Sequence, residues 1–287
     1  MMAHVAASGE ARGRVVLSLA ATPRVPPLAL AAAIRVAHAF GAEVEAVMIE
    51  DHRVLDAAGF PGAIALSGNG VDLGHAGLGS IEADLERAFA AARRAVELAC
   101  RAAKVKAHAR RVRGEPLSEL ASACAEMGPW NVVVLAESLR ASGAEGLGRL
   151  LESVWDTTGF VMLGPLARRL DGPIIVAIED LDRLPALLRT SERLAISGAT
   201  EVVLVLIGDD AATLGWMEAE VRRTMMGERP REIRRVTAAH GAASAVIETL
   251  RRRAPGFLLA RYGGLVVPAD DLSAVCEGLE CPLLVVR

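Results

Sequence analysis

The sequence is poor in aromatic residues and has little net charge. Phe, Trp and Tyr make up 3% of its 287 residues, which leaves few side chains to stack on nucleic-acid bases. A net charge of -3 gives no general attraction to a polyanion. We therefore expect no nucleic-acid partner.

Cysteine is also scarce, and its spacing is not that of a metal site. The four cysteines, at positions 100, 124, 276 and 281, form no C-x-x-C pair, and no histidine stands at zinc-ligand spacing from them. Cys100 and Cys124 fall on apolar helix stripes, and free cysteine is usually buried. We expect buried thiols in a reducing compartment.

Long apolar runs are missing. The longest, residues 26–34, is far shorter than the ~20 residues that a membrane span needs. The first 14 residues carry Glu10, Arg12 and Arg14 and have no apolar core like that of a signal peptide. We expect a cytoplasmic protein with no membrane partner.

Catalytic signatures are absent as well. The sequence contains no G-x-S-x-G, H-E-x-x-H, kinase or P-loop pattern. The paired acids at 209–210 and 270–271 fall at turns and helix starts, where capping explains them. We expect a non-enzymatic protein.

What the sequence does contain is one series of elements that occurs twice. The apolar run at 15–20 matches the run at 174–179, and a turn and a helical stretch follow each. Segment 41–51 matches segment 198–210, because in both a glycine ends a helix, an apolar strand follows and acids close it.

The later elements also occur in pairs, one in each half. They are a helix at 81–96 and a shorter one around 216–226, basic strands at 106–113 and 231–236, helices at 117–124 and 246–250, buried strands at 131–136 and 257–260, and closing strands at 160–163 and 282–287. Strands that alternate with helices favour parallel pairing with right-handed crossovers.

The predicted fold class is therefore α/β. We predict two tandem doubly wound, mainly parallel five-stranded sheets of Rossmann-like type, with domains at residues 1–167 and 168–287. The join at 166–172 is short, so we expect the halves to pack against each other.

Several phrases resemble the universal stress protein family. RGEPLSELA at 113–121 resembles its Gly-Asp-Pro segment and the following helix, NVVVLA at 131–136 resembles its "DLIVMG" strand, and CPLLVVR at 281–287 resembles its closing "CPVLVV" strand. The resemblance implies the adenine nucleotide alpha-hydrolase-like variant of the fold. It also implies intramolecular pairing of the halves through their closing strands, and it leaves a homodimer open.

Members of that family that bind nucleotides carry an aspartate after the first strand and a G-x-x-G loop after the fourth. Glycines there let backbone N–H groups approach phosphates. In the first half, Ala20 stands at the aspartate position, Ala136 and Leu139 replace the first glycines, and Glu152 precedes Ser153 where glycine belongs. A carboxylate at that place repels phosphate.

The second half departs from the family pattern differently. Glu179 keeps an acid after the first strand, whereas Ala260 replaces the first glycine of the loop. Gly263 and Gly264 remain, and Ala269 stands where a later glycine belongs. The resemblance with these departures predicts a stress-response or regulatory protein, with a degraded ATP motif, that binds a small ligand or a protein partner.

The alternative is ATP or another adenine nucleotide, held in the first half by altered contacts. The loop at 138–143 offers hydroxyls and a guanidinium at the carboxyl edge of the sheet, although an ordinary polar loop explains it too. The candidate binding residues are Thr22, Ser138, Arg140, Ser142, Gly143 and Ser153.

Two further features have competing interpretations. A glycine-rich insert at 68–79 lacks the lysine of a P-loop, and we favour a mobile insertion over a lid or partner-binding loop. Arginine clusters at 110–113, 234–235 and 251–253 form either a basic face or solvated charges beside acids. We favour the second interpretation.

Overall fold

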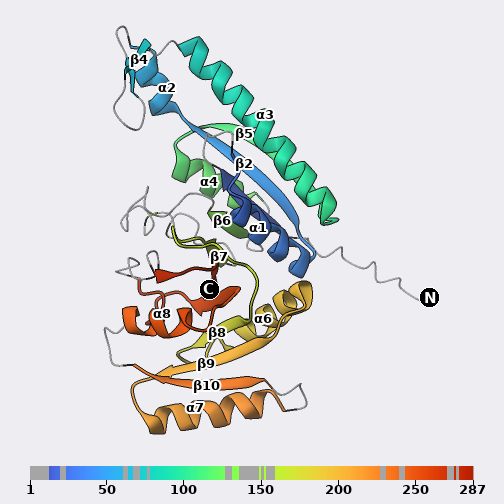
Figure 1. Ribbon diagram of the computed structural model, residues 1–287, viewed down its shortest axis with the longest axis vertical. Coiled ribbons are helices and arrows are strands. Elements are labelled where there is room, and N and C mark those ends of the chain that lie inside the picture. The colour runs from blue at the N-terminus through green and yellow to red at the C-terminus, as the bar shows by residue number, and fades with distance from the viewer. Residues whose placement is uncertain are drawn as a thin grey trace, which may run out of the picture.

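The computed structural model describes residues 13–19, 24–60, 64–66, 72–75, 78–126, 131–135, 149, 152, 159–226, 231–238, 243–269, 275 and 278–286. Strands and helices alternate along these residues and build one main sheet, with helices on both of its faces (Figure 1). Within the described ranges, no helix is both long and apolar enough to cross a membrane.

The first half supplies five strands of the main sheet: β1 (Arg14–Leu19), β2 (Glu43–Asp51), β5 (Ala107–Gly114), β6 (Val132–Leu135) and β7 (Gly159–Met162). Its described helices are α1 (Pro27–Phe40), α2 (His52–Ala58), α3 (Leu78–Ala102) and α4 (Pro116–Ala125). Pro27 and Pro116 stand at the starts of α1 and α4, where proline has no backbone N–H to leave unsatisfied.

Part of the glycine-rich insert forms regular secondary structure. β3 (Ile64–Leu66) and β4 (Asp72–His75) pair in antiparallel fashion in a small separate sheet. The range 68–79 therefore contains β4 and the first residues of α3. The sequence did not predict this pair, because three- and four-residue strands beside glycines show little periodicity.

The second half supplies the other five strands: β8 (Ile174–Ile178), β9 (Val202–Gly208), β10 (Glu232–Thr237), β11 (Phe257–Arg261) and β12 (Leu283–Val286). Its main described helices are α6 (Leu184–Gly198), α7 (Ala211–Thr224) and α8 (Ala243–Arg251). α7 has 14 residues against 25 in α3, so the prediction of a shorter second helix is confirmed.

The strand order of the main sheet is β10-β9-β8-β11-β12-β7-β6-β1-β2-β5. Every pairing is parallel except that of β7 with β12. Counted outward from that seam, each half has the same order: its fifth, fourth, first, second and third main strand. The predicted α/β class is confirmed, and hydrogen bonds join the two five-stranded parts into one ten-stranded sheet.

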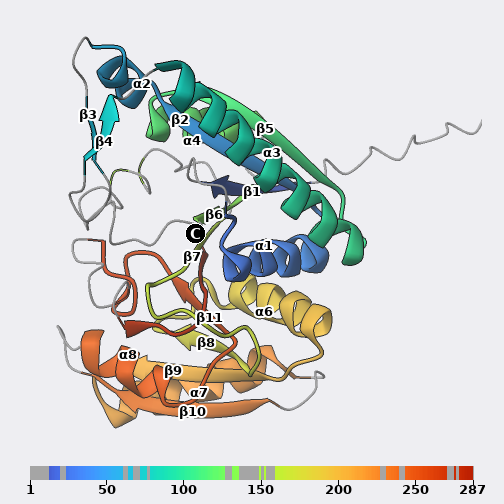
Figure 2. The ribbon, with the colours of Figure 1, turned by 45° about the horizontal axis from the view of Figure 1, so that its top comes forward.

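Both faces of the sheet are buried, as its continuously apolar strands indicate. All described positions of β6, β7, β8 and β12 are buried. Side chains on one face pack against α1, α3, α6 and α7, whereas alternate side chains pack against α4 and α8 on the other face. Figures 1 and 2 show these helices on the two sides of the sheet.

The seam between the halves is buried and closely packed. In the β7–β12 pair, Phe160 lies opposite Val285 and Val161 opposite Leu284. Phe160 and Val285 are both 0% exposed. Gly159 is needed for the close approach, because a Cβ there would lie 2.6 Å from the carbonyl oxygen of Val285.

A second contact between the halves is made by α1 and α6, which lie side by side in Figure 2. Arg35 on α1 donates hydrogen bonds to the carbonyl oxygen of Leu170, at 2.8 Å, and to the hydroxyl of Thr200, at 3.0 Å. Its guanidinium carbon lies 5.4 Å from the ring centre of Phe257. Gly198 leaves room for this side chain, since a Cβ there would lie 2.3 Å from Arg35 Nη2.

The reciprocal contact is made by Arg193 on α6. Its guanidinium carbon lies 5.5 Å from the ring centre of Phe40, the last residue of α1. Arg193 stands five residues before the end of α6, and Arg35 stands five residues before the end of α1. Equivalent arginines therefore reach across the contact in opposite directions.

Candidate functional site

In doubly wound sheets, ligands usually bind at the carboxyl ends of the strands. In the second half that edge is formed by the residues after β8 and by the loop after β11. The sequence places Glu179 directly after β8, and it places Gly263 and Gly264 two and three residues beyond the end of β11. Parallel pairing of β8 with β11 brings these two segments together.

The carboxylate of Glu179 binds the backbone of this loop. Its Oε1 accepts a hydrogen bond from the N–H of Val266, at 2.9 Å, and its Oε2 accepts one from the N–H of Leu265. A Cβ at position 264 would lie 2.1 Å from Oε2, so glycine is required for this approach. Gly263 adopts a positive φ of 76°, which bends the loop around the carboxylate.

The residue after Glu179 is also acidic, and it pairs with an arginine at the same edge. Asp180 forms an ion pair with Arg261, the last residue of β11. The Nε of Arg261 is buried and has no hydrogen-bond partner within the described part of the chain. Two consecutive acids after β8 thus occupy the loop amides and the guanidinium, the groups that would receive an anion.

The carboxyl edge of the first half also holds charges in pairs. Glu50, on β2, is 2% exposed and binds Arg111 of β5 through both carboxylate oxygens, one of them at 3.0 Å from Nη2. The Nε of Arg113 lies 3.5 Å from the same carboxylate. The hydrogen bond to Glu50 raises the pKa of Arg111 above its usual value.

These contacts refine the interpretation of the arginine clusters. Arg234 pairs with Glu232 and Arg252 pairs with Glu248 on exposed surface, which agrees with solvated charges beside acids. Arg111 differs, because its partner Glu50 is buried. The predicted acidic partners are present, but not all of them are solvated.

The predicted nucleotide-binding residues cannot be placed. All six of them, Thr22, Ser138, Arg140, Ser142, Gly143 and Ser153, lie outside the described residues. Of their neighbours, Glu152 is described, and it is an exposed helical residue. The altered first-half site stays a prediction.

Sequence reasoning identified Glu179 as a retained acid but missed its contact with the loop. The available signal was the pair Gly263 and Gly264, because adjacent glycines after a strand allow another group to approach the backbone closely.

The part of the chain that is described contains no group of three or more His, Cys, Asp and Glu residues arranged to hold a metal ion.

Comparisons with known proteins find likeness in structure but not in sequence. No protein-family model matches the chain, and no curated protein matches it. A universal stress protein from Archaeoglobus fulgidus superposes with a TM-score of 0.58 at 15% identity, over 95% of this chain and 96% of that one. A putative universal stress protein from Pseudomonas aeruginosa gives 0.58 at 13% identity, over 95% and 92%.

The cytoplasmic domain of a prokaryotic cation chloride cotransporter is similar too. It gives a TM-score of 0.53 at 9% identity, over 96% of this chain and 95% of that one. Likeness at such identities concerns the fold alone, and one fold serves several functions. The resemblance in sequence, the strand order and these superpositions lead to one conclusion: the chain has the fold of the universal stress proteins.

Proposed function

We propose that this chain is a non-enzymatic regulatory protein of universal stress type, which acts in the cytoplasm and binds a small ligand or a protein partner. Its second half does not hold ATP at the carboxyl edge of the sheet. One observation carries this proposal: the Glu179 carboxylate accepts the N–H groups of Leu265 and Val266. Those amides lie in the loop after β11, where the resemblance places the phosphate-binding loop.

The physical reason is competition between two anions for the same donors. Hydrogen bonds to a carboxylate are roughly twice as strong as neutral ones. A phosphate entering this loop would have to displace Glu179 while lying close to its negative charge and to that of Asp180. Arg261, the cation at the end of β11, is already paired with Asp180 and so offsets little of this repulsion.

The arrangement of the halves supports an internal pseudo-dimer. Each half has the same strand order, β7 and β12 pair in antiparallel fashion, and Arg35 and Arg193 make reciprocal contacts. Such reciprocity is the pattern of a two-fold interface between like units. In this proposal the units are residues 1–167 and 168–287, and neither nucleic acid nor a membrane is a partner.

Titration with ATP, followed by thermal unfolding, tests the proposal. A ligand present at about 100 times its dissociation constant adds about 2.7 kcal/mol of stability. We expect no shift of the wild-type protein at millimolar ATP, and no phosphate release above the buffer rate. A saturable shift in the wild type would contradict the proposal, and its loss in Arg140→Ala would place the nucleotide in the first half.

The Glu179→Gln variant tests whether Glu179 is the group that keeps phosphate out of the loop. Glutamine keeps the size and one acceptor oxygen but removes the charge, so repulsion of phosphate should fall. We expect weak stabilisation by inorganic pyrophosphate in this variant and none in the wild type. Glu220→Gln, on the exposed surface of α7, is the matched control and should behave as the wild type. Equal responses of all three proteins would remove Glu179 as the block.

A further inference from the structure

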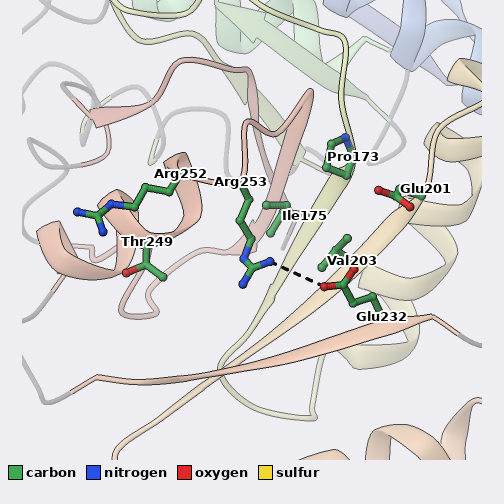
Figure 3. Close-up of a pocket in the computed structure, with 8 residues that line it drawn as sticks. All are labelled: Pro173, Ile175, Glu201, Val203, Glu232, Thr249, Arg252 and Arg253. Atoms are coloured by element: carbon green, nitrogen blue, oxygen red, sulfur yellow. Dashed lines mark ion pairs between the residues drawn. The ribbon is translucent and has the colours of Figure 1, made fainter.

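A pocket of about 450 Å³ lies at the amino ends of β8, β9 and β10, beside the end of α8 (Figure 3). Ile175 and Val203 form its apolar floor. Glu201 and Glu232 stand on the strand side, and Arg253 stands on the helix side. The pocket is at the edge of the sheet opposite to Glu179, so it does not depend on the proposed function.

Two charges of this pocket are available to a ligand. Glu201 is exposed and forms no ion pair with any described residue. Arg253 has only a long contact, 3.8 Å, with Glu232, whose carboxylate also binds Arg234. In Figure 3 the carboxylate of Glu201 and the guanidinium of Arg253 lie on either side of the floor residues Ile175 and Val203.

The strand register identifies the equivalent place in the first half. Val15 of β1 pairs with Val44 of β2, and Ile174 of β8 pairs with Val202 of β9. The residues just before each pair are therefore equivalent. These are Arg14 and Glu43 in the first half, against Pro173 and Glu201 in the second. By the same register, Glu45 is equivalent to Val203.

In the first half, this place is filled by an internal cation. The Arg14 guanidinium contacts Glu45, which is 5% exposed, and lies 3.8 Å from Glu43. Arg110 completes the cluster, with its Nε 2.8 Å from Glu45 Oε1. In the second half Pro173 replaces the arginine, yet an acid remains at Glu201. A carboxylate and an apolar hollow are left where the first half holds a guanidinium.

We propose that this pocket binds free arginine or a closely similar amino acid with a guanidinium group. The guanidinium lies against Glu201, at the place equivalent to Glu43, whose carboxylate is 3.8 Å from Arg14, and the methylene chain lies along Pro173 and Val203. The ligand's carboxylate pairs with the guanidinium of Arg253. A volume of about 450 Å³ is within the usual range of small-molecule sites.

Calorimetric titration of the full chain with three probes tests the ligand class. L-arginine carries both charges, agmatine lacks the carboxylate, and L-citrulline is a neutral isostere of the guanidinium. We expect saturable binding of L-arginine and at least tenfold weaker binding of both agmatine and citrulline, because each of them lacks one charge and so loses one charge-assisted contact. Absence of saturable heat with L-arginine, or equal binding of citrulline, would overturn the proposal.

Variants of the chain test the position. Glu201→Gln should weaken L-arginine binding at least tenfold, whereas Glu43→Gln, at the equivalent place in the first half, should leave it unchanged. Pro173→Arg supplies the internal cation and should abolish binding, while its circular dichroism stays that of the wild type. Equal weakening by Glu201→Gln and Glu43→Gln, or wild-type binding by Pro173→Arg, would overturn the assignment. The proposed function concerns ATP at the opposite edge of the sheet, so the outcome of the ATP titration is independent of L-arginine binding.

Discussion

The amino edges of the two halves differ far more than their sheets do. In the first half, Glu45 is buried beside Arg14 and Arg110, and Arg110 also pairs with Glu126 at the end of α4. In the second half, the equivalent of Glu45 is Val203, and a pocket remains beside α8. Every strand of the main sheet contributes to the shared core, which constrains the strand order, whereas an edge side chain contacts only a few neighbours, so the two edges can differ.

Cutting the seam between the halves should have the largest effect. Residues 1–167 and 168–287 produced separately would expose β7 and β12, whose described side chains are buried. Exposing a large apolar side chain to water costs about 1.5–3 kcal/mol of stability. We expect the separate pieces to aggregate or to bind a hydrophobic dye, as judged by size-exclusion chromatography and fluorescence. Monodisperse single halves would show that the seam is dispensable.

Removing the charge of the buried acid Glu45 in the first half should cost the protein more stability than removing that of the exposed acid Glu201 in the second. Glu45→Gln removes the buried carboxylate that Arg14 and Arg110 share and leaves them only the more exposed acids Glu43 and Glu126, which should cost about 1.5–3 kcal/mol, the usual worth of a hydrogen bond to a charged group. Glu201→Gln removes an exposed charge that has no ion pair among the described residues, and it should change stability by less than about 0.5 kcal/mol. Urea unfolding at fixed pH compares the two midpoints. Equal losses would contradict the comparison.

The equivalent arginines of α1 and α6 provide a finer test. Arg35→Ala leaves the carbonyl of Leu170 and the hydroxyl of Thr200 without their donor, which should cost about 1–3 kcal/mol. Arg193→Ala loses mainly an exposed contact with the ring of Phe40, worth about 0.5–1 kcal/mol. Thermal unfolding should therefore give Arg35→Ala a lower melting temperature than Arg193→Ala. The reverse order would contradict the greater weight of the hydrogen bonds of Arg35.

The two halves should differ least in the reactivity of their described thiols. Burial raises the pKa of Cys100 to about 11, and it raises those of Cys124 and Cys281 to about 12. We expect all three to resist iodoacetamide at pH 8 in the folded protein, as measured by peptide mass spectrometry, because the thiolate is the nucleophile. Rapid labelling of any one of them would contradict its burial.

The same shifts give a pH dependence of stability. The folded protein holds these thiol protons more tightly than the unfolded chain, whose thiols ionise near pH 9. The resulting stabilisation is fully present below pH 9 and is lost as the pH rises toward about 12. Replacement of Cys124 and Cys281 by alanine should flatten the alkaline limb of the stability curve.

Much of the fold was predictable from local patterns, and less of the candidate site was. Short apolar runs rich in β-branched residues, such as Val132–Leu135 and Ile174–Ile178, are typical of buried strands, so their order along the chain led to the fold class. The small sheet of β3 and β4 was missed because its strands are too short to show a period. The contact of Glu179 with Leu265 was missed because it joins residues 86 positions apart.

By itself, the sequence determined the alternation of strands and helices and its recurrence in two halves, since periodicity and turn residues act over a few neighbouring positions. Only the tertiary structure decided which charges became internal partners. Glu45, Glu50 and Glu179 are ordinary acids in the sequence, and each acquired its donors when strands or loops distant along the chain came side by side. A buried carboxylate is stable only beside such donors, and their position is set by strand register.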